Sequence, residues 1–163
     1  MLRKLILRCL GQIRHVRFLG CSTSPRLESM RAQLVGLRIR LWLACGVGVV
    51  IVGPPGSGKS FLLERVFPGR LIAPDLATLM ATGIRPPLTV SNLPQGHIAI
   101  DELNCFERSS VEWGLRELRQ RPVVFAFQTP QLIQELNIHS AFEGRLAVLF
   151  LGSRKYWQDR NWQ

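Results

Sequence analysis

The feature that most constrains the fold is a glycine-rich segment at residues 53–60, Gly-Pro-Pro-Gly-Ser-Gly-Lys-Ser, which directly follows the apolar run 47–52. This arrangement matches the G-x-x-x-x-G-K-S pattern of a phosphate-binding loop between a buried strand and a helix. Glycines let successive backbone N–H groups turn toward one anion, and the N-terminus of the following helix favours negative charge. An apolar helical pattern does begin at Phe61. The segment therefore predicts a nucleotide-binding P-loop, the Walker A element.

The polar residues of this loop have separate expected roles, with ATP and Mg²⁺ as the ligands. Lys59 is expected to reach the β- and γ-phosphates, and Ser60 to offer its hydroxyl to Mg²⁺. The residues expected to bind the nucleotide are Gly53, Pro54, Pro55, Gly56, Ser57, Gly58, Lys59, Ser60 and Phe61.

A second informative stretch, residues 97–103, reads His-Ile-Ala-Ile-Asp-Glu-Leu. An apolar strand that ends in two acids downstream of a phosphate loop is typical of a Walker B element. We expect Asp101 to hold Mg²⁺ through water and Glu102 to activate the attacking water as general base.

A polar residue also ends the apolar run 122–127, which we expect to form the strand beside the Asp-Glu strand. That residue, Gln128, is the candidate for sensing the γ-phosphate, with Thr129 as the second choice. The expected catalytic residues are thus Glu102, Lys59 and Gln128.

Five short apolar runs alternate with helical patterns along the chain, which predicts an α/β fold. We expect a three-layer α/β/α P-loop domain with a five-stranded, mainly parallel sheet, preceded by basic N-terminal helices, with the ligand at the carboxyl ends of the strands. The expected divisions are a basic amphipathic helix and linker at 1–26, a helical lead-in at 27–46, the P-loop core at 47–151, and a short aromatic and basic tail at 152–163.

The first 40 residues carry most of the net positive charge, with nine basic side chains against Glu28 alone. Within residues 2–16 the apolar side chains recur at helical spacing and the basic ones fall on the other side. Three interpretations stay open: a helix packed on the body or on a partner, a surface for an anionic membrane or nucleic acid, and an organelle-targeting segment.

A second helical pattern runs from residue 27 to about residue 43, with leucines and a methionine at alternating spacings of three and four. We expect this seam to pack on the body of its own domain and, less often, to pair with another subunit. The seam residues are Leu27, Met30, Leu34, Leu37 and Leu41.

Other site classes find little support in the sequence. The four cysteines lie far apart, with no C-x-x-C pair and no histidine at metal-ligand spacing. The apolar run 41–52 is shorter than the roughly 20 residues that a membrane-spanning helix needs. We therefore expect free thiols, no transmembrane span and a cytoplasmic protein, with an organelle matrix or a peripheral membrane position as the alternatives.

With these motifs, the chain resembles the additional-strand, catalytic-glutamate division of P-loop NTPases over about residues 47–151. It is most similar to the FtsK–HerA group of DNA-pumping, conjugative and packaging ATPases, whose strand ending in A-T-Q-R-P and later strand-opening Arg correspond to residues 126–130 and to Arg145. Phe127 and Thr129 depart from that pattern. The resemblance implies a homo-oligomer or a larger machine in which a neighbouring subunit supplies an arginine; the candidates are Arg108, Arg116, Arg119, Arg121 and Arg145.

The preferred hypothesis is a small Mg²⁺-dependent ATPase that acts on or beside DNA, in transfer, packaging or replication. In this hypothesis the basic N-terminal helices supply sequence-independent phosphate contacts. Two alternatives stay open: an ATP-binding adaptor or regulatory module with little turnover, and a small-molecule kinase.

Overall fold

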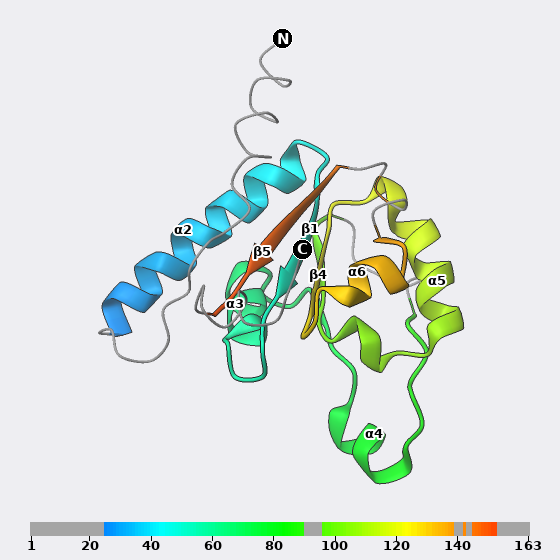
Figure 1. Ribbon diagram of the computed structural model, residues 1–163. Helices are drawn as coiled ribbons and strands as arrows, with labels where there is room; N and C mark the ends of the chain where they lie inside the picture. Colours follow the sequence, from blue (N-terminus) through cyan, green and yellow to red (C-terminus); the bar gives the residue numbers. More distant parts are fainter. Residues whose placement is uncertain (1–24, 90–95, 139–141, 143–144, 153–163) are drawn as a thin grey trace.

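The computed structural model describes residues 25–89, 96–138, 142 and 145–152, and its centre is a five-stranded sheet (Figure 1). All the paired strands are parallel, in the order β2-β3-β4-β1-β5, which confirms the expected α/β class. The strands are β1 (Gly48–Val52), β2 (Leu71–Ile72), β3 (Ile98–Ile100), β4 (Val123–Phe127) and β5 (Leu146–Phe150).

Helices cover both faces of this sheet. The helices are α2 (Pro25–Ala44), α3 (Lys59–Val66), α4 (Leu76–Thr82), α5 (Arg108–Glu117) and α6 (Gln131–Glu135), with short 3-10 turns η1 (Leu103–Cys105) and η2 (Leu118–Gln120). Apolar residues of α2 and α3 pack on one face of the sheet, and those of α5 and α6 pack on the other. The result is the expected three-layer arrangement.

The central strands β1, β3 and β4 are buried along their whole length, whereas the edge strands β2 and β5 are mostly half-buried. Along β1, Val50 and Val52 join the core under α5, whereas Val49 and Ile51 join the core under α2 and α3. Side chains of a strand alternate between faces, so a continuous apolar run fills both cores at once.

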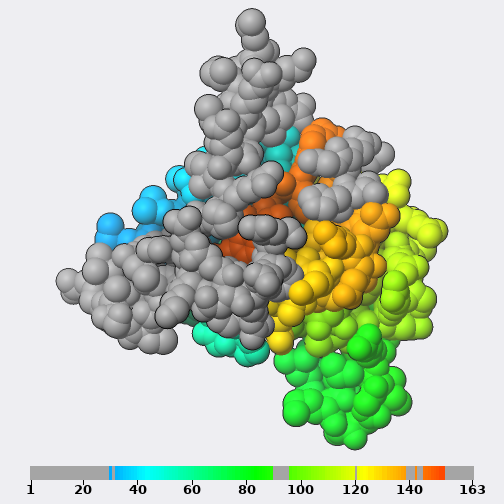
Figure 2. Space-filling view, viewed as in Figure 1, coloured from blue at the N-terminus to red at the C-terminus, as the bar shows by residue number. Residues whose placement is uncertain are grey.

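Helix α4 stands apart from this body and buries none of its residues (Figures 1 and 2). Asp75 caps its N-terminus by accepting hydrogen bonds from the N–H groups of Ala77 and Thr78, both at 3.1 Å. Gly83 ends it in the left-handed conformation, with φ 70°. Hydrogen bonds from Thr78 hold the pKa of the Asp75 carboxyl below its ordinary value. Local capping, rather than packing, therefore defines this helix.

The expected packing of α2 is wrong for four of the five seam residues. Met30, Leu34, Leu37 and Leu41 are 59, 66, 57 and 50% exposed. A different face meets the body, and its fully buried residues include Ile39 and Trp42. Gly36 lies on that buried face, where an added Cβ would come within 2.8 Å of Val66. The small residues Gly36 and Ala32 let this face approach α3 closely, which a seam of leucines would prevent.

Several expectations fall on residues outside the described ranges, among them the amphipathic helix at 2–16, most of the linker and the tail at 153–163. Among the described helices, none has the length and apolar character to cross a membrane. Cys105 is a free thiol, as expected.

We predict that Leu62→Ala destabilises the protein far more than Leu76→Ala. Leu62 of α3 is fully buried, so its truncation leaves a cavity and is expected to lower the free energy of unfolding by about 2–5 kcal/mol. Leu76 of α4 is 46% exposed, and its truncation is expected to cost less than about 1 kcal/mol. Urea unfolding of both variants measures the difference, and equal losses would contradict the assigned packing of α3.

Candidate functional site

The two motifs meet at the carboxyl edge of the sheet, where β1, β3 and β4 end side by side. β4 lies between the other two strands, and pairs Val52 with Phe127 and Ile100 with Phe125. The N–H of Gly53 continues this ladder by donating to the Phe127 carbonyl at 3.2 Å. This strand order brings the glycine-rich loop, the acidic pair and Gln128 to one place.

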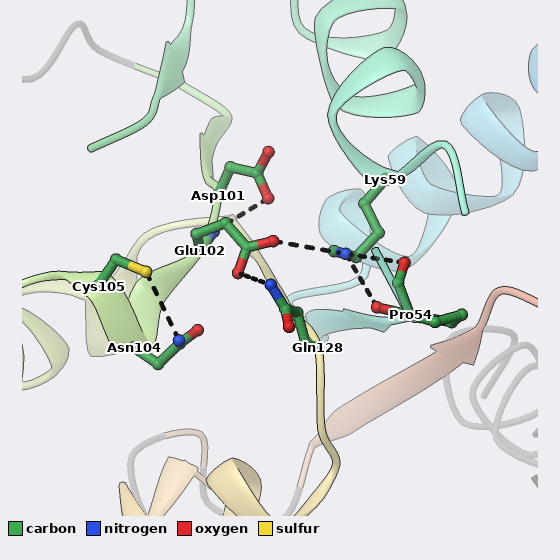
Figure 3. Close-up of polar contacts among 8 residues, drawn as sticks. Pro54, Lys59, Asp101, Glu102, Asn104, Cys105 and Gln128 are labelled. Atoms are coloured by element: carbon green, nitrogen blue, oxygen red, sulfur yellow. Dashed lines mark hydrogen bonds and ion pairs between the residues drawn. The ribbon is translucent and has the colours of Figure 1, made fainter. Parts of the chain in front are cut away.

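Lys59 is the centre of the contacts at this edge (Figure 3). Its side chain is 5% exposed, and its Nζ donates to the carbonyl of Gly53 at 2.8 Å and to that of Pro54 at 3.3 Å. A carboxylate oxygen of Glu102 lies 3.4 Å from the same nitrogen. A buried ammonium needs such partners, because burial without them is costly.

Glu102 reaches Lys59 because its backbone adopts an uncommon conformation. Its φ of 44° and ψ of 50° lie in the left-handed region, which costs a residue other than glycine about 1–2 kcal/mol. The neighbouring Asp101 supports this turn, since its Oδ1 accepts a hydrogen bond from the Glu102 N–H at 2.9 Å. Backbone strain of this kind concentrates at functional sites. Nothing in the sequence pattern indicated this turn.

Gln128 lies beside Glu102, as its place at the end of the neighbouring strand predicted. The Gln128 Nε2 donates to the second carboxylate oxygen of Glu102 at 3.5 Å, a long hydrogen bond, and the glutamine side chain is exposed (Figure 3). Glu102 is therefore held between a cation from the loop and an amide from β4.

The loop itself has the backbone that an anion-binding cradle requires. Gly56 and Gly58 have φ values of 74° and 86°, and neither has an atom within 4 Å of an added Cβ. A Cβ on Gly53 would collide with the Ser57 hydroxyl. That hydroxyl oxygen is buried and makes no hydrogen bond within the described residues. A buried donor of this kind fits a phosphate oxygen.

The two residues expected to hold Mg²⁺ supply hard oxygen atoms, which this ion prefers. Asp101 is 3% exposed, and its carboxylate follows β3 directly. Ser60 is exposed in the first turn of α3, and no hydrogen bond joins it to Asp101 in the part of the chain that the structure describes. The oxygen atoms of both residues are of the type that could serve as Mg²⁺ ligands. Phe61, expected to contact the nucleotide, is 54% exposed in the same turn.

Cys105 is a neighbour of the site that the sequence did not single out. Burial raises the pKa of its thiol, and the negative charge of Glu102 raises it further. The side-chain amide of Asn104 donates to its sulfur at 3.6 Å. The thiol therefore stays protonated near neutral pH, which is unsuitable for a nucleophile.

The candidate arginines are divided between two parts of the molecule. Arg121 and Arg145 precede β4 and β5, so both lie at the amino edge of the sheet, opposite the loop. The other three belong to α5 or to η2, and one of them, Arg108, pairs with Glu112 at 3.2 Å on the surface. This amino-edge position places Arg121 and Arg145 at the opposite end of the sheet from the glycine-rich loop of the same chain.

Comparison with protein-family models and with curated protein sequences finds no match for the chain.

Proposed function

We propose that this protein binds ATP with Mg²⁺ and hydrolyses it. The observation that carries the proposal is the meeting of Lys59, Glu102 and Gln128 beside a glycine-rich loop at the carboxyl edge of a parallel sheet. Phosphoryl transfer to water requires a cation that binds the phosphates and a carboxylate that activates the attacking water. It also uses a polar group beside that carboxylate.

The loop binds the triphosphate by replacing internal contacts with contacts to phosphate oxygens. The Lys59 ammonium exchanges its bonds to the Gly53 and Pro54 carbonyls for stronger, charge-assisted bonds to the β- and γ-phosphates. The Ser57 hydroxyl gains the acceptor that it lacks within the described residues. Ser60 and Asp101 would hold Mg²⁺, which neutralises phosphate charge.

Hydrolysis then needs Glu102 as a free carboxylate. When the Lys59 ammonium binds the phosphates instead of Glu102, the Glu102 carboxylate loses its cationic partner. It then accepts a proton from the attacking water. The water oxygen forms a bond to the γ-phosphorus, and the bond between that phosphorus and the β–γ bridging oxygen breaks, which releases ADP and phosphate. Gln128 orients the Glu102 carboxylate through its amide N–H.

We predict that Lys59→Met weakens ATP binding by about 10- to 100-fold, because a hydrogen bond to a charged group contributes about 1.5–3 kcal/mol. Methionine keeps the apolar stem of this buried side chain. Titration with a fluorescent ATP analogue measures the affinity, and thermal unfolding confirms that the variant is folded. Unchanged affinity would refute the assignment of the loop.

We predict that Glu102→Gln lowers ATP turnover by about 100-fold or more, as expected for loss of a general base. ATP binding should be retained or tighter, because a negative charge beside the phosphates is removed. Phosphate release and nucleotide titration measure the two effects. Glu112→Gln is the matched control, since Glu112 is exposed on α5 in a surface ion pair. A fully active Glu102→Gln variant would remove Glu102 from this role.

The proposal extends to DNA, which the basic N-terminal residues would contact through its phosphates. Such contacts lower log K linearly with log salt concentration, so binding should weaken strongly as salt rises. The proposed coupling of ATP turnover to DNA rests on the charge of residues 1–40, which contain nine basic residues and one acidic residue.

We predict that DNA stimulates ATP turnover at low salt, and that the triple variant Lys4→Gln, Arg8→Gln, Arg14→Gln loses this stimulation but keeps basal turnover. Turnover assays with single- and double-stranded DNA at two salt concentrations test this. Turnover that is indifferent to DNA would exclude the coupling. Tight ATP binding without turnover would favour an adaptor. Transfer of the γ-phosphoryl group only to an added small-molecule acceptor, and not to water, would favour a kinase.

A further inference from the structure

Helix α2 presents a row of large apolar side chains that no described residue covers. The side chains of Met30, Leu34, Leu37 and Leu41, here called the α2 row, are each at least half exposed, whereas the opposite face of the helix is buried against the body. Their spacings of four, three and four are those of a helix-packing seam, and the row is about 16 Å long. Exposed apolar surface of this extent indicates a packing partner.

Helix α4 carries a second exposed apolar surface. The side chains of Leu76, Met80 and Ile84, here called the α4 patch, are 46, 87 and 70% exposed. The helix buries none of its residues and stands apart from the body, on the side away from α2 (Figures 1 and 2). The α2 row and the α4 patch of one chain are therefore too far apart to cover each other, but each is open to a helix of another chain.

The charges beside the two surfaces are opposite in sign. Arg38 and Arg40 fall on the two sides of the α2 row at helical spacing, and neither has an acidic partner among the described residues. Asp75 is the only charged residue of the segment 73–84, which contains the α4 patch. Two α2 rows packed together would bring like charges together, whereas the α4 patch brings a carboxylate toward a guanidinium.

We infer that the α4 patch of one chain packs across the α2 row of a second copy of the same chain. The seven residues of α4 extend about 10 Å, so this helix fits within the length of the row. Leu76 and Met80, one turn apart, would enter the spaces between neighbouring side chains of the row, with Met80 beside Leu37 at its middle. Asp75, at the end of α4, would then lie on the Arg38 side of the row.

This contact joins two different surfaces, so it is heterologous. A pair of chains keeps one open α2 row and one open α4 patch, and further copies add until the assembly closes into a ring. The contact is small, and we expect a dissociation constant on the order of 10–100 µM for one pair. Self-association should therefore depend strongly on protein concentration.

Two variants of the full chain with an inserted charge test the inference. Leu37→Glu places a carboxylate in the α2 row and Met80→Glu places one in the α4 patch, both at exposed positions. In analytical ultracentrifugation, the mass of the unchanged chain should rise above that of one chain as its concentration passes through the expected range. Each variant alone should associate about tenfold more weakly or less. Trp113→Glu is the matched control, because Trp113 is an exposed apolar residue of α5 outside both surfaces, and it should associate like the unchanged chain.

A mixture of the two variants gives the sharpest outcome. The Leu37→Glu chain keeps its α4 patch and the Met80→Glu chain keeps its α2 row, so an equimolar mixture retains one intact contact and should form particles of two chains and no larger. The inference would be overturned by an unchanged chain that stays single throughout the range, by full association of either variant alone, or by a mixture that stays single. Thermal unfolding checks that each variant is folded, and the measurement does not depend on ATP turnover.

A mixture of Leu37→Cys and Met80→Cys chains checks the same contact without an inserted charge. Mild oxidation should link position 37 of one chain to position 80 of another in preference to links between identical positions, because a disulfide requires Cα atoms within about 7 Å. Peptide mapping by mass spectrometry under non-reducing conditions identifies the links. Links mainly between two copies of position 37 would assign the α2 row to a symmetric pair and would contradict the inference.

Discussion

The burial of one ammonium group is the constraint on which the rest of the site depends. Lys59 lies almost fully buried at the start of α3, where an uncompensated positive charge would be strongly unfavourable. Two carbonyls of the loop and the carboxylate of Glu102 compensate it. Those partners come from two strands that are not neighbours in the sheet, so the site exists only when the sheet has formed.

The strand order explains how the partners arrive. β4 separates β1 from β3, and the left-handed turn at Glu102 directs its side chain across the end of β4 toward the loop. Gln128, at the end of β4, occupies the space between them. The backbone strain at Glu102 is tolerated because three contacts favour the same conformation. These are the ion pair with Lys59, the long hydrogen bond from Gln128, and the hydrogen bond from the Glu102 N–H to the Asp101 carboxylate. Under the proposed function, exchange of Lys59 from Glu102 to phosphate would alter the balance of these contacts, and nucleotide binding would then leave the Glu102 carboxylate without its cationic partner.

Helix α2 has two apolar faces, and the distinction between them illustrates a general limit of periodicity. The row ending at Leu41 and the row containing Ile39 and Trp42 both satisfy helical spacing. The leucines give the first row the more pronounced hydrophobic periodicity. The second row nevertheless packs on the body, because Gly36 and Ala32 permit a close approach to α3. Complementary shape decided the packing face, and the hydrophobic pattern alone contained no information about the shape of the opposing surface.

The sequence by itself determined the class of fold, the order of the elements and the position of the candidate site. Short apolar runs before turn residues predicted all five strands, and the glycines with Lys59 predicted the loop, because these signals are local in the chain. Only the tertiary structure decided the side on which α2 packs, the left-handed turn at Glu102 and the ion pair between Lys59 and Glu102. Each of these depends on atoms far apart in the sequence, whose distances are set by how sheet and helices pack together.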